Sequence, residues 1–124
     1  MSNPDNDGCT ETPVTVTLRR GEILDRFSLS DQPKRDGGRY FSTPEYNFHS
    51  RSLPYDCNSM IYYTYTVQEP VTLQSCNTAA YYDEPGGAIQ YMTSNEETTI
   101  ADLIRDRYVS VNVNQYSFDN PCSR

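Results

Sequence analysis

The sequence has no tryptophan, a single histidine and no long apolar run. No segment approaches the roughly 18–20 consecutive apolar residues of a membrane-spanning helix. Cations are scarce as well: 10 Lys and Arg stand against 17 Asp and Glu, which gives a formal net charge of −7. Nucleic acids and anionic membranes attract basic surfaces, so we expect neither as a partner. A small anionic ligand held by a few local arginines remains compatible with this charge.

Metal-binding and glycosylation motifs are absent too. The four cysteines include no CxxC pair and only one histidine accompanies them, so we expect no metal site. No Asn-x-Ser/Thr sequon is present. An even number of cysteines favours two disulfides in an oxidising compartment, with three pairings open, and four buried free thiols are the alternative. The cysteines are Cys9, Cys57, Cys76 and Cys122.

The N-terminal stretch MSNPDNDG is polar and lacks the apolar core of a signal peptide. We therefore expect either a secreted protein whose leader has been removed or an exported effector that uses another route. Residues 1–12 are predicted to be flexible unless a disulfide at Cys9 tethers them. Residues 13–124 are predicted to form one domain, which is an ordinary length for a single core.

Tyrosine is abundant: the chain has 11 Tyr and 4 Phe, although only 35% of its residues are hydrophobic. That share lies below the roughly 45–50% of typical globular domains. A buried tyrosine packs a large ring but needs a partner for its hydroxyl. We therefore expect a half-polar core that lines a cleft.

Alternating apolar and polar residues predict an α+β domain built on a small twisted antiparallel or mixed sheet with one or two short helices. In the segment 61–67 we expect Tyr63 and Tyr65 on one face and Tyr62 on the other, and we expect it to form a hairpin with 71–76. GEILDRF (21–27) is predicted to be a helical turn or bend. A helix is predicted within 98–108, capped by Thr98 or Thr99. The predicted strands are 14–18, 61–67, 71–76, 88–92 and 108–113.

Arg26 and Arg51 are the first candidates for binding a ligand. Both lie beside aromatic and Pro- or Gly-containing segments, and a guanidinium group binds a diphosphate through two parallel charge-assisted hydrogen bonds. The alternative is that they form surface ion pairs of little energetic worth, Arg26 with Asp25 or Glu22 and Arg51 with Asp56.

Gln90 is the third candidate, because a glutamine on an otherwise apolar strand needs hydrogen-bond partners from the backbone or from a ligand. It follows the Gly-Gly turn of PGGAIQY, where the missing side chains let the backbone approach a ligand closely. The lone His49 is expected to be structural, and the cysteines have no nearby cation that would activate a thiolate.

Five segments in this order resemble the tuberculosis necrotizing toxin family of NAD glycohydrolases, over about residues 20 to 113. The chain is more similar to the secreted fungal NADases of this family than to the bacterial toxins, which keep a histidine where this chain has Tyr63. The segments are ILDRF, GGRYFS, RSLPY with the strand YYTYTV after it, PGGAIQY and IADLIRDRYVSVNV.

The resemblance implies hydrolysis of the nicotinamide–ribose bond, with NAD and NADP as substrates and no cofactor. It implies catalytic roles for Gln90 and Arg51 and a substrate-binding role for Arg26. The aromatic residue of the cleft is Phe41 or Tyr40, and Tyr63 lines the same face. It also implies an exported toxin with an immunity or inhibitor protein, or a homodimer, as a partner.

Two other functions remain open at this stage. An ADP-ribosyltransferase cuts the same bond but needs a glutamate at the ribose, and Glu84, Glu96 and Glu97 lie near PGGAIQY without a recognisable transferase motif. A non-enzymatic, disulfide-stapled binding module would show neither NAD turnover nor stabilisation by NAD.

Overall fold

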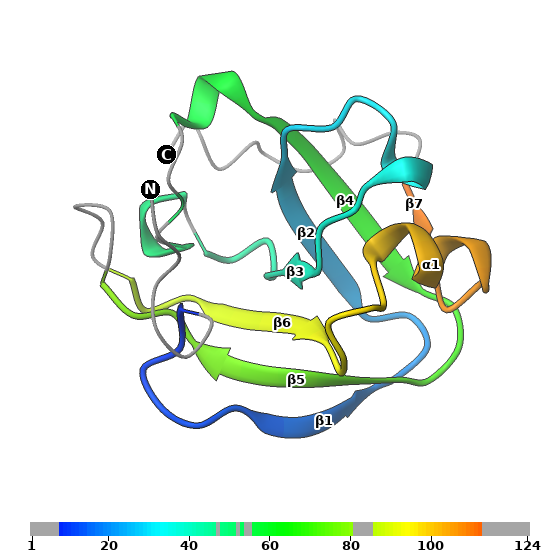
Figure 1. The fold of residues 1–124 in the computed structure, drawn as a ribbon, viewed down its shortest axis with the longest axis horizontal. Helices are drawn as coiled ribbons and strands as arrows, with labels where there is room; N and C mark the ends of the chain where they lie inside the picture. The colour runs from blue at the N-terminus through cyan, green and yellow to red at the C-terminus, as the bar shows by residue number, and fades with distance from the viewer. Residues whose placement is uncertain (1–7, 47, 52, 54–55, 81–85, 113–124) are drawn as a thin grey trace.

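Seven strands in two antiparallel sheets make up most of the regular secondary structure in the computed structural model, which describes residues 8–46, 48–51, 53, 56–80 and 86–112 (Figure 1). One sheet has the strand order β1-β5-β6-β3, and the other has the order β2-β4-β7. The predicted α+β class is confirmed, with two small sheets where one was expected. The strands are β1 (Val14–Leu18), β2 (Ile23–Ser28), β3 (Tyr40–Phe41), β4 (Ile61–Val67), β5 (Val71–Asn77), β6 (Ile89–Thr93) and β7 (Val109–Val111).

Three short 3₁₀ turns and a single six-residue α-helix, α1 (Ile100–Arg105), complete the regular secondary structure of the described residues. Thr99 caps α1 with a reciprocal capping box: its hydroxyl accepts from the N–H of Asp102, and the Asp102 carboxylate accepts from the N–H of Thr99. Of the two threonines predicted as caps, Thr99 is the one that the structure uses. In the described part of the chain no helix has the length and apolar character to cross a membrane.

Strand β4 separates two cores, as its alternation predicts. Tyr63, Tyr65 and Val67 belong to the main core between the two sheets, which α1 closes with Ile100 and Leu103. Tyr62 faces the other way and packs with Phe27 and Phe48 in a smaller cluster. The main core also contains Leu18, Leu24, Phe41, Val71, Leu73 and Val109.

The prediction of a helical turn at 21–27 is wrong, because residues 23–28 form strand β2. Leu24 and Phe27 are three residues apart, which imitates the spacing of one helix face. They instead point to opposite sides of β2, since Leu24 joins the main core and Phe27 the smaller cluster. A strand that buries both faces loses the simple alternation by which strands are recognised.

The predicted hairpin of 61–67 with 71–76 is also wrong. Both segments are strands, but β4 pairs with β2 and β7, whereas β5 pairs with β1 and β6. Figure 1 shows the chain leaving β4 and crossing into the other sheet before β5 begins. The N–H groups of Gln68 and Glu69 donate to the carbonyl of Tyr108, so the connection is bonded to the turn after α1.

A disulfide between Cys9 and Cys76 joins the N-terminal segment to β5. Two backbone hydrogen bonds support this attachment, from Thr10 N–H to the carbonyl of Asn77 and from Ala79 N–H to the carbonyl of Gly8. Cys57 is disulfide-bonded too. Cys122 lies outside the described residues, as do residues 1–7 of the segment predicted to be flexible.

Candidate active site

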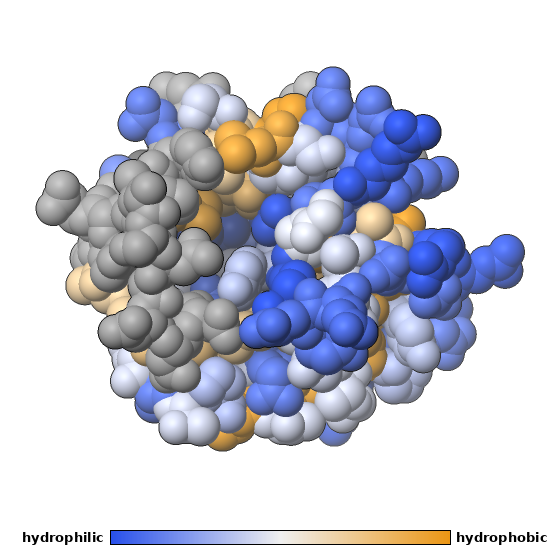
Figure 2. All heavy atoms as spheres, viewed as in Figure 1, coloured by the Kyte–Doolittle hydropathy of each residue, from blue (hydrophilic) through white to orange (hydrophobic). Residues whose placement is uncertain are grey.

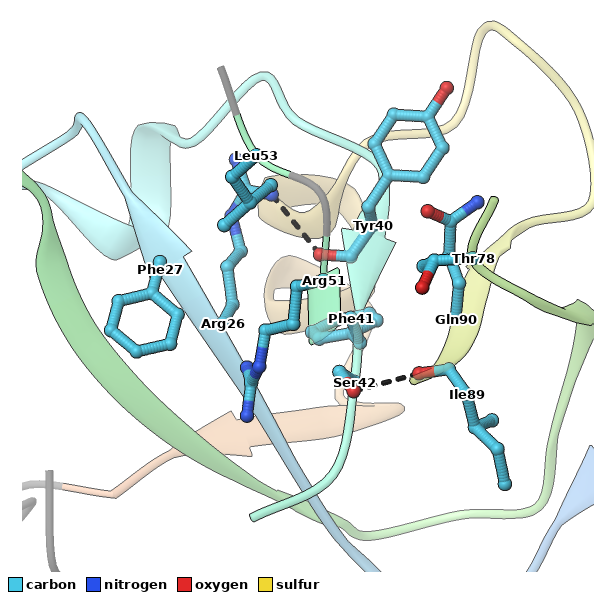
Figure 3. Close-up of a pocket in the computed structure, with 10 residues that line it drawn as sticks. All are labelled: Arg26, Phe27, Tyr40, Phe41, Ser42, Arg51, Leu53, Thr78, Ile89 and Gln90. Carbon is cyan, nitrogen blue, oxygen red and sulfur yellow. Dashed lines mark hydrogen bonds between the residues drawn. The ribbon is translucent and has the colours of Figure 1, made fainter. Parts of the chain in front are cut away.

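A cavity opens where the two sheets meet, and five of the six predicted site residues line it (Figure 3). The sheets are joined there by two backbone hydrogen bonds of 2.9 Å between Asp25 in β2 and Ser42 just after β3. Segments far apart in the sequence therefore meet at one seam. The lining residues are Arg26, Phe27, Tyr40, Phe41, Ser42, Arg51, Leu53, Thr78, Ile89 and Gln90.

Arg51 reaches the cavity from a 3₁₀ turn (His49–Arg51), but its guanidinium group is almost fully buried. It forms a bidentate ion pair with Asp25, at 2.7 and 2.8 Å, and also donates to the carbonyls of Thr43 and Tyr46. Its Cζ atom lies 4.9 Å from the ring centroid of Phe27. In Figure 3 the guanidinium group points away from Gln90. These contacts hold Thr43, Tyr46 and Arg51 against β2.

Arg26 lies on the opposite face of β2 and is also paired with a carboxylate. Its Nε and Nη2 atoms donate to Asp36 at 2.8 and 3.1 Å, and its Nη1 atom donates to the carbonyl of Tyr40, the dashed line in Figure 3. Its side chain is 16% exposed, against 4% for Arg51. Arg26 is therefore the arginine with an edge open to a ligand.

Asp36 is held as a carboxylate by its neighbours. Burial raises the pKa of a carboxyl group, but the hydrogen bonds and the charge of Arg26 oppose this effect. The N–H of Gly38 and the hydroxyl of Ser28 also donate to Asp36, and together these contacts bring its pKa below the usual value. A methyl group at Gly38 would lie 2.6 Å from Cζ of Arg26, so the guanidinium group needs glycine there.

Both predicted aromatic residues contribute to the site, in different ways. Phe41 is buried in the main core and makes an edge contact with Tyr65 at 5.1 Å between ring centroids. Tyr40 is only partly buried, and Figure 3 shows its hydroxyl pointing away from the cavity floor. Phe41 therefore forms the floor of the cavity and Tyr40 forms its rim.

Gln90 projects from β6 on the wall opposite Arg26 (Figure 3). Its Nε2 atom lies 3.9 Å from the sulfur atoms of both Cys9 and Cys76. The two glycines before Gln90 are needed by the backbone conformation. Gly86 and Gly87 have positive φ angles, and a methyl group at Gly86 would lie 2.6 Å from the carbonyl oxygen of Thr78. The tight approach that the Gly-Gly turn predicted is thus to the backbone at residues 78–79.

Tyr63 is the one predicted site residue that the structure does not bring to the cavity. It is buried in the main core, and its hydroxyl donates to the carbonyl of Ser30 at 3.1 Å. Burial, followed by the charges of Asp31 and Asp36, raises its pKa above the ordinary value for tyrosine. The hydroxyl therefore stays protonated at neutral pH, and the side chain belongs to the main core rather than to the cavity.

The sequence-based reasoning missed the two carboxylates that hold the arginines. Arg26 pairs with Asp36 and Arg51 with Asp25, instead of the surface partners Asp25, Glu22 and Asp56 considered as the alternative. Asp25 is fully buried and also accepts a 2.7 Å hydrogen bond from the hydroxyl of Tyr62. An aspartate directly after the apolar residues Ile23 and Leu24 was the available signal.

Polar wall residues were missed as well. Ser42 donates to the carbonyl of Ile89, and the buried Thr78 donates to the carbonyl of Ser50 and accepts from the N–H of Ala88. Both side chains join segments distant in sequence, and nothing in their local sequence context distinguishes them. The lone His49 is exposed and makes an edge contact with Phe48, in agreement with a structural role.

The cavity is small and contains no carboxylate among its described lining residues. Its volume is about 40 Å³, whereas sites that enclose a whole drug-sized ligand measure roughly 300–1,000 Å³. Figure 2 shows the surface hollowed near β2 and β3, with hydrophilic residues on the side of α1. The described site can therefore enclose one end of a larger ligand whose remainder lies in the open hollow.

Of the glutamates considered for a transferase, Glu96 and Glu97 are exposed and do not line the cavity. Glu84 lies outside the described residues. No group of three or more His, Cys, Asp or Glu side chains within the described ranges is placed to hold a metal ion.

Comparison with known proteins gives a family match and structural similarities. The family model described as "Tuberculosis necrotizing toxin" matches residues 17–111. No curated protein sequence matches the chain significantly. Tuberculosis necrotizing toxin, solved in complex with its immunity factor, aligns with a TM-score of 0.65 at 22% identity, over 86% of this chain and 59% of the toxin chain. This chain thus spans less than two thirds of that toxin chain.

A second solved structure, Rhs1-CT in complex with its cognate immunity protein, aligns with a TM-score of 0.51 at 13% identity. The alignment covers 73% of this chain and 76% of that chain. At these identities the two alignments establish similarity of fold, and the family model is the finding that bears on identity.

Proposed function

Because the chain belongs to the tuberculosis necrotizing toxin family, we propose that it is an NAD(P) glycohydrolase that releases nicotinamide and ADP-ribose. The observation that carries the proposal is the meeting of Arg26, Tyr40, Phe41, Arg51 and Gln90 at one cavity. These residues were selected from sequence motifs spread over 65 positions, and the fold brings them together.

The chemistry suits a cavity without an acid. When the bond between the ribose carbon and nicotinamide breaks, its electron pair stays on the ring nitrogen and nicotinamide leaves as a neutral molecule. No proton donor is needed for this departure, and the ribose passes through an oxocarbenium-like transition state. The enzyme has to orient the ribose, stabilise its positive charge and admit one water molecule.

In our proposal Gln90 acts on the reacting ribose. Its amide oxygen accepts a hydrogen bond from the attacking water or from a ribose hydroxyl, and Phe41 packs against the nicotinamide end. The small volume of the cavity fits this assignment, since it accommodates the reacting end of the dinucleotide and leaves the diphosphate in the open hollow. Tyr40 lies at the rim between the two.

The two arginines receive different roles. Arg26 keeps an exposed edge, so we assign the diphosphate contact to Arg26. The guanidinium group of Arg51 donates hydrogen bonds to Asp25 and to two backbone carbonyls, so we assign Arg51 mainly to holding the cavity wall. Arg26→Ala should therefore raise KM for NAD by about tenfold, which corresponds to one lost charged contact of about 1.4 kcal/mol, whereas Arg51→Ala should mainly destabilise the fold.

Hydrolysis is favoured over protein ADP-ribosylation by the absence of a carboxylate from the described lining of the cavity. A transferase would be expected to place a glutamate at the ribose. Incubation with NAD alone discriminates the two: free ADP-ribose in a one-to-one ratio with nicotinamide supports the hydrolase, and labelled acceptor protein supports the transferase. A binding module would release neither product.

Gln90→Ala is the direct test of the mechanism. We expect kcat for nicotinamide release to fall by about 100-fold or more, as for the loss of one well-placed transition-state contact. Gln74→Ala is the matched control, because Gln74 lies on the neighbouring strand β5 and its amide bonds only the exposed Thr15 side chain. A folded Gln90→Ala variant with wild-type turnover would remove Gln90 from the mechanism.

The proposal includes export and an inhibitory partner. Both aligned structures are complexes with an immunity factor or immunity protein, and a cell that makes an NAD-consuming enzyme needs to restrain it before export. The disulfide between Cys9 and Cys76 fits passage through an oxidising compartment.

A further inference from the structure

The Cys9–Cys76 disulfide lies beside Gln90, on the same face of the β5–β6 pair. Cys76 and Gln90 face each other across the β5–β6 pair, and both sulfur atoms lie 3.9 Å from the side-chain nitrogen of Gln90. Both cysteines are buried. Tyr40, at the rim of the cavity, packs against the cluster formed by Cys9, Cys76 and Met92.

The same disulfide fixes a second part of the wall. Cys9 forms an isolated antiparallel bridge with Thr78, whose side chain lines the cavity. Thr10 N–H and Ala79 N–H bond the carbonyls of Asn77 and Gly8, on either side of this bridge. Residues 8–10 thus pair with the end of β5 and the residues after it, close to Gln90, and the Cys9–Cys76 disulfide holds them there.

Disulfide sulfur atoms are weak hydrogen-bond acceptors, so their main effect on Gln90 is to form a rigid flank. A bonded pair holds both sulfur atoms at one position, whereas two separate thiols rotate independently about their own χ1 angles. Catalytic groups need positions accurate to a fraction of an ångström, and a displacement of about 1 Å can cost about 100-fold in rate.

We propose that the Cys9–Cys76 disulfide is a positioning element for Gln90, so that the enzyme turns over NAD rapidly only while this bond is intact. This inference rests on the proposed function. Reduction by a dithiol breaks the sulfur–sulfur bond, passes two electrons and two protons to Cys9 and Cys76, and leaves the reductant as its own disulfide. Substrate binding through Arg26, on the opposite wall, is unaffected.

The test uses the double variant Cys9→Val/Cys76→Val. It keeps apolar side chains beside Gln90 but removes the disulfide bond and both sulfur atoms. The control pair Cys57→Val/Cys122→Val removes the other two cysteines and leaves the neighbours of Gln90 in place. Nicotinamide release gives kcat and KM. The side-chain amide resonance of Gln90 in ¹⁵N-labelled protein, assigned by its loss in Gln90→Ala, reports its position without any need for activity.

We expect kcat of the Cys9/Cys76 pair to fall at least about tenfold, with KM within threefold of wild type and a shifted Gln90 resonance. The control pair should keep kcat within threefold and the resonance in place. A folded Cys9/Cys76 pair with wild-type kcat and an unmoved resonance overturns the inference. If the pair does not fold, the Cys57→Val/Cys122→Val protein, whose remaining cysteines are Cys9 and Cys76, is titrated with a dithiol, and unchanged kcat and resonance after two thiols appear overturn the inference.

Failure of the proposed function gives a different result. Wild-type protein that releases no nicotinamide from NAD contradicts the glycohydrolase, whatever the state of the disulfide. The Gln90 resonance then still decides whether the disulfide positions this side chain, because a shift on removal of the bond supports the positioning and an unmoved signal overturns it.

Discussion

Tyr62 and Tyr65 lie on opposite faces of β4 and differ in whether their hydroxyl groups have a partner. The hydroxyl of Tyr62 donates to the buried carboxylate of Asp25 at 2.7 Å. The hydroxyl of Tyr65 is buried without a hydrogen-bond partner among the described residues, and burial raises its pKa strongly. One ring of the tyrosine-rich strand therefore stabilises a charged network, and the other carries an unsatisfied polar atom.

Replacing each tyrosine by phenylalanine should have opposite effects on stability. Tyr62→Phe should lower the free energy of unfolding by about 2 kcal/mol, because a hydrogen bond to a charged group contributes about 1.5–3 kcal/mol. Tyr65→Phe should leave it unchanged or raise it by up to about 1 kcal/mol, since it removes a buried hydroxyl that has no partner. Urea unfolding with unchanged m-values measures both, and equal losses would contradict the assignment.

Gly38 and Gly37 provide a matched pair that tests the placement of Arg26. A methyl group at Gly38 would lie 2.6 Å from Cζ of Arg26, whereas a methyl group at Gly37 has no atom within 4 Å. Gly38→Ala should push the guanidinium group away from Asp36 and raise KM for NAD by about tenfold, the equivalent of about 1.4 kcal/mol. Gly37→Ala should change KM less than twofold. Steady-state kinetics decides, and equal KM values would separate Arg26 from the substrate.

At the scale of elements, strand positions were predictable from the sequence and strand partners were not. Local alternation places β1, β4, β5, β6 and β7 within a few residues of their observed bounds. The pairing of β4 with β2 joins segments about 40 residues apart, and a pattern read within one segment contains no information on such contacts. Asp25 could not be predicted as the partner of Arg51 for the same reason, because the pair joins β2 to a distant turn and forms only in the folded protein.

Helix α1 supports the loop that positions Arg26. The N–H groups of Ile100 and Ala101 donate to the carbonyls of Gly38 and Asp36, so the first turn of α1 is bonded to the segment carrying the partner of Arg26. This arrangement makes the helix cap relevant to the site, although the cap itself lies outside the cavity.

Thr99→Ala should lower the free energy of unfolding by about 1 kcal/mol, the usual effect of losing a threonine cap. Thr98→Ala is the control and should cost less than about 0.5 kcal/mol, because the hydroxyl of Thr98 donates to the side chain of the exposed Asn95 and does not cap α1. Thermal or urea unfolding compares the two variants. A larger loss for Thr98→Ala would mean that the helix begins earlier than the structure indicates.

For the whole molecule, the site depends on how the two sheets are joined. The backbone bridge between Asp25 and Ser42 brings the sheets together, and the ion pairs of Arg51 and Arg26 lie on either side of β2 next to this bridge. Motif order selected five residues that line one cavity, whereas Tyr63, selected in the same way, faces the main core. The network that joins the sheets is charged, so the stability of the molecule should depend on pH.

Four carboxyl groups in the described part of the chain have a pKa below the usual value, and they set the acid limit of stability. Hydrogen bonds from Thr10, from the backbone of Thr99 and from Arg105 lower the pKa of Glu11, Asp102 and Asp106 in turn, and Arg26 outweighs burial at Asp36. As the pH falls below about 5, the unfolded chain therefore binds protons that the folded protein does not. The free energy of unfolding should change little between this range and neutral pH, and it should decrease as the pH falls through 4 toward 3.

Asp36→Asn measures how much the ion pair of Arg26 with Asp36 contributes to this loss of stability at low pH. The variant should be less stable than wild type at pH 7, because Arg26 loses its charged partner. The difference should shrink as the pH falls below 4, since Asp36 takes up a proton in the unfolded chain there, whereas the folded protein keeps the carboxylate until its lowered pKa is reached. Asp106→Asn should show a smaller difference from wild type, because Asp106 is exposed and water screens its ion pair with Arg105. Urea midpoints at pH 7, 5, 4 and 3 measure the difference, and a gap that stays constant down to pH 3 would show that the charge of Asp36 does not stabilise the fold.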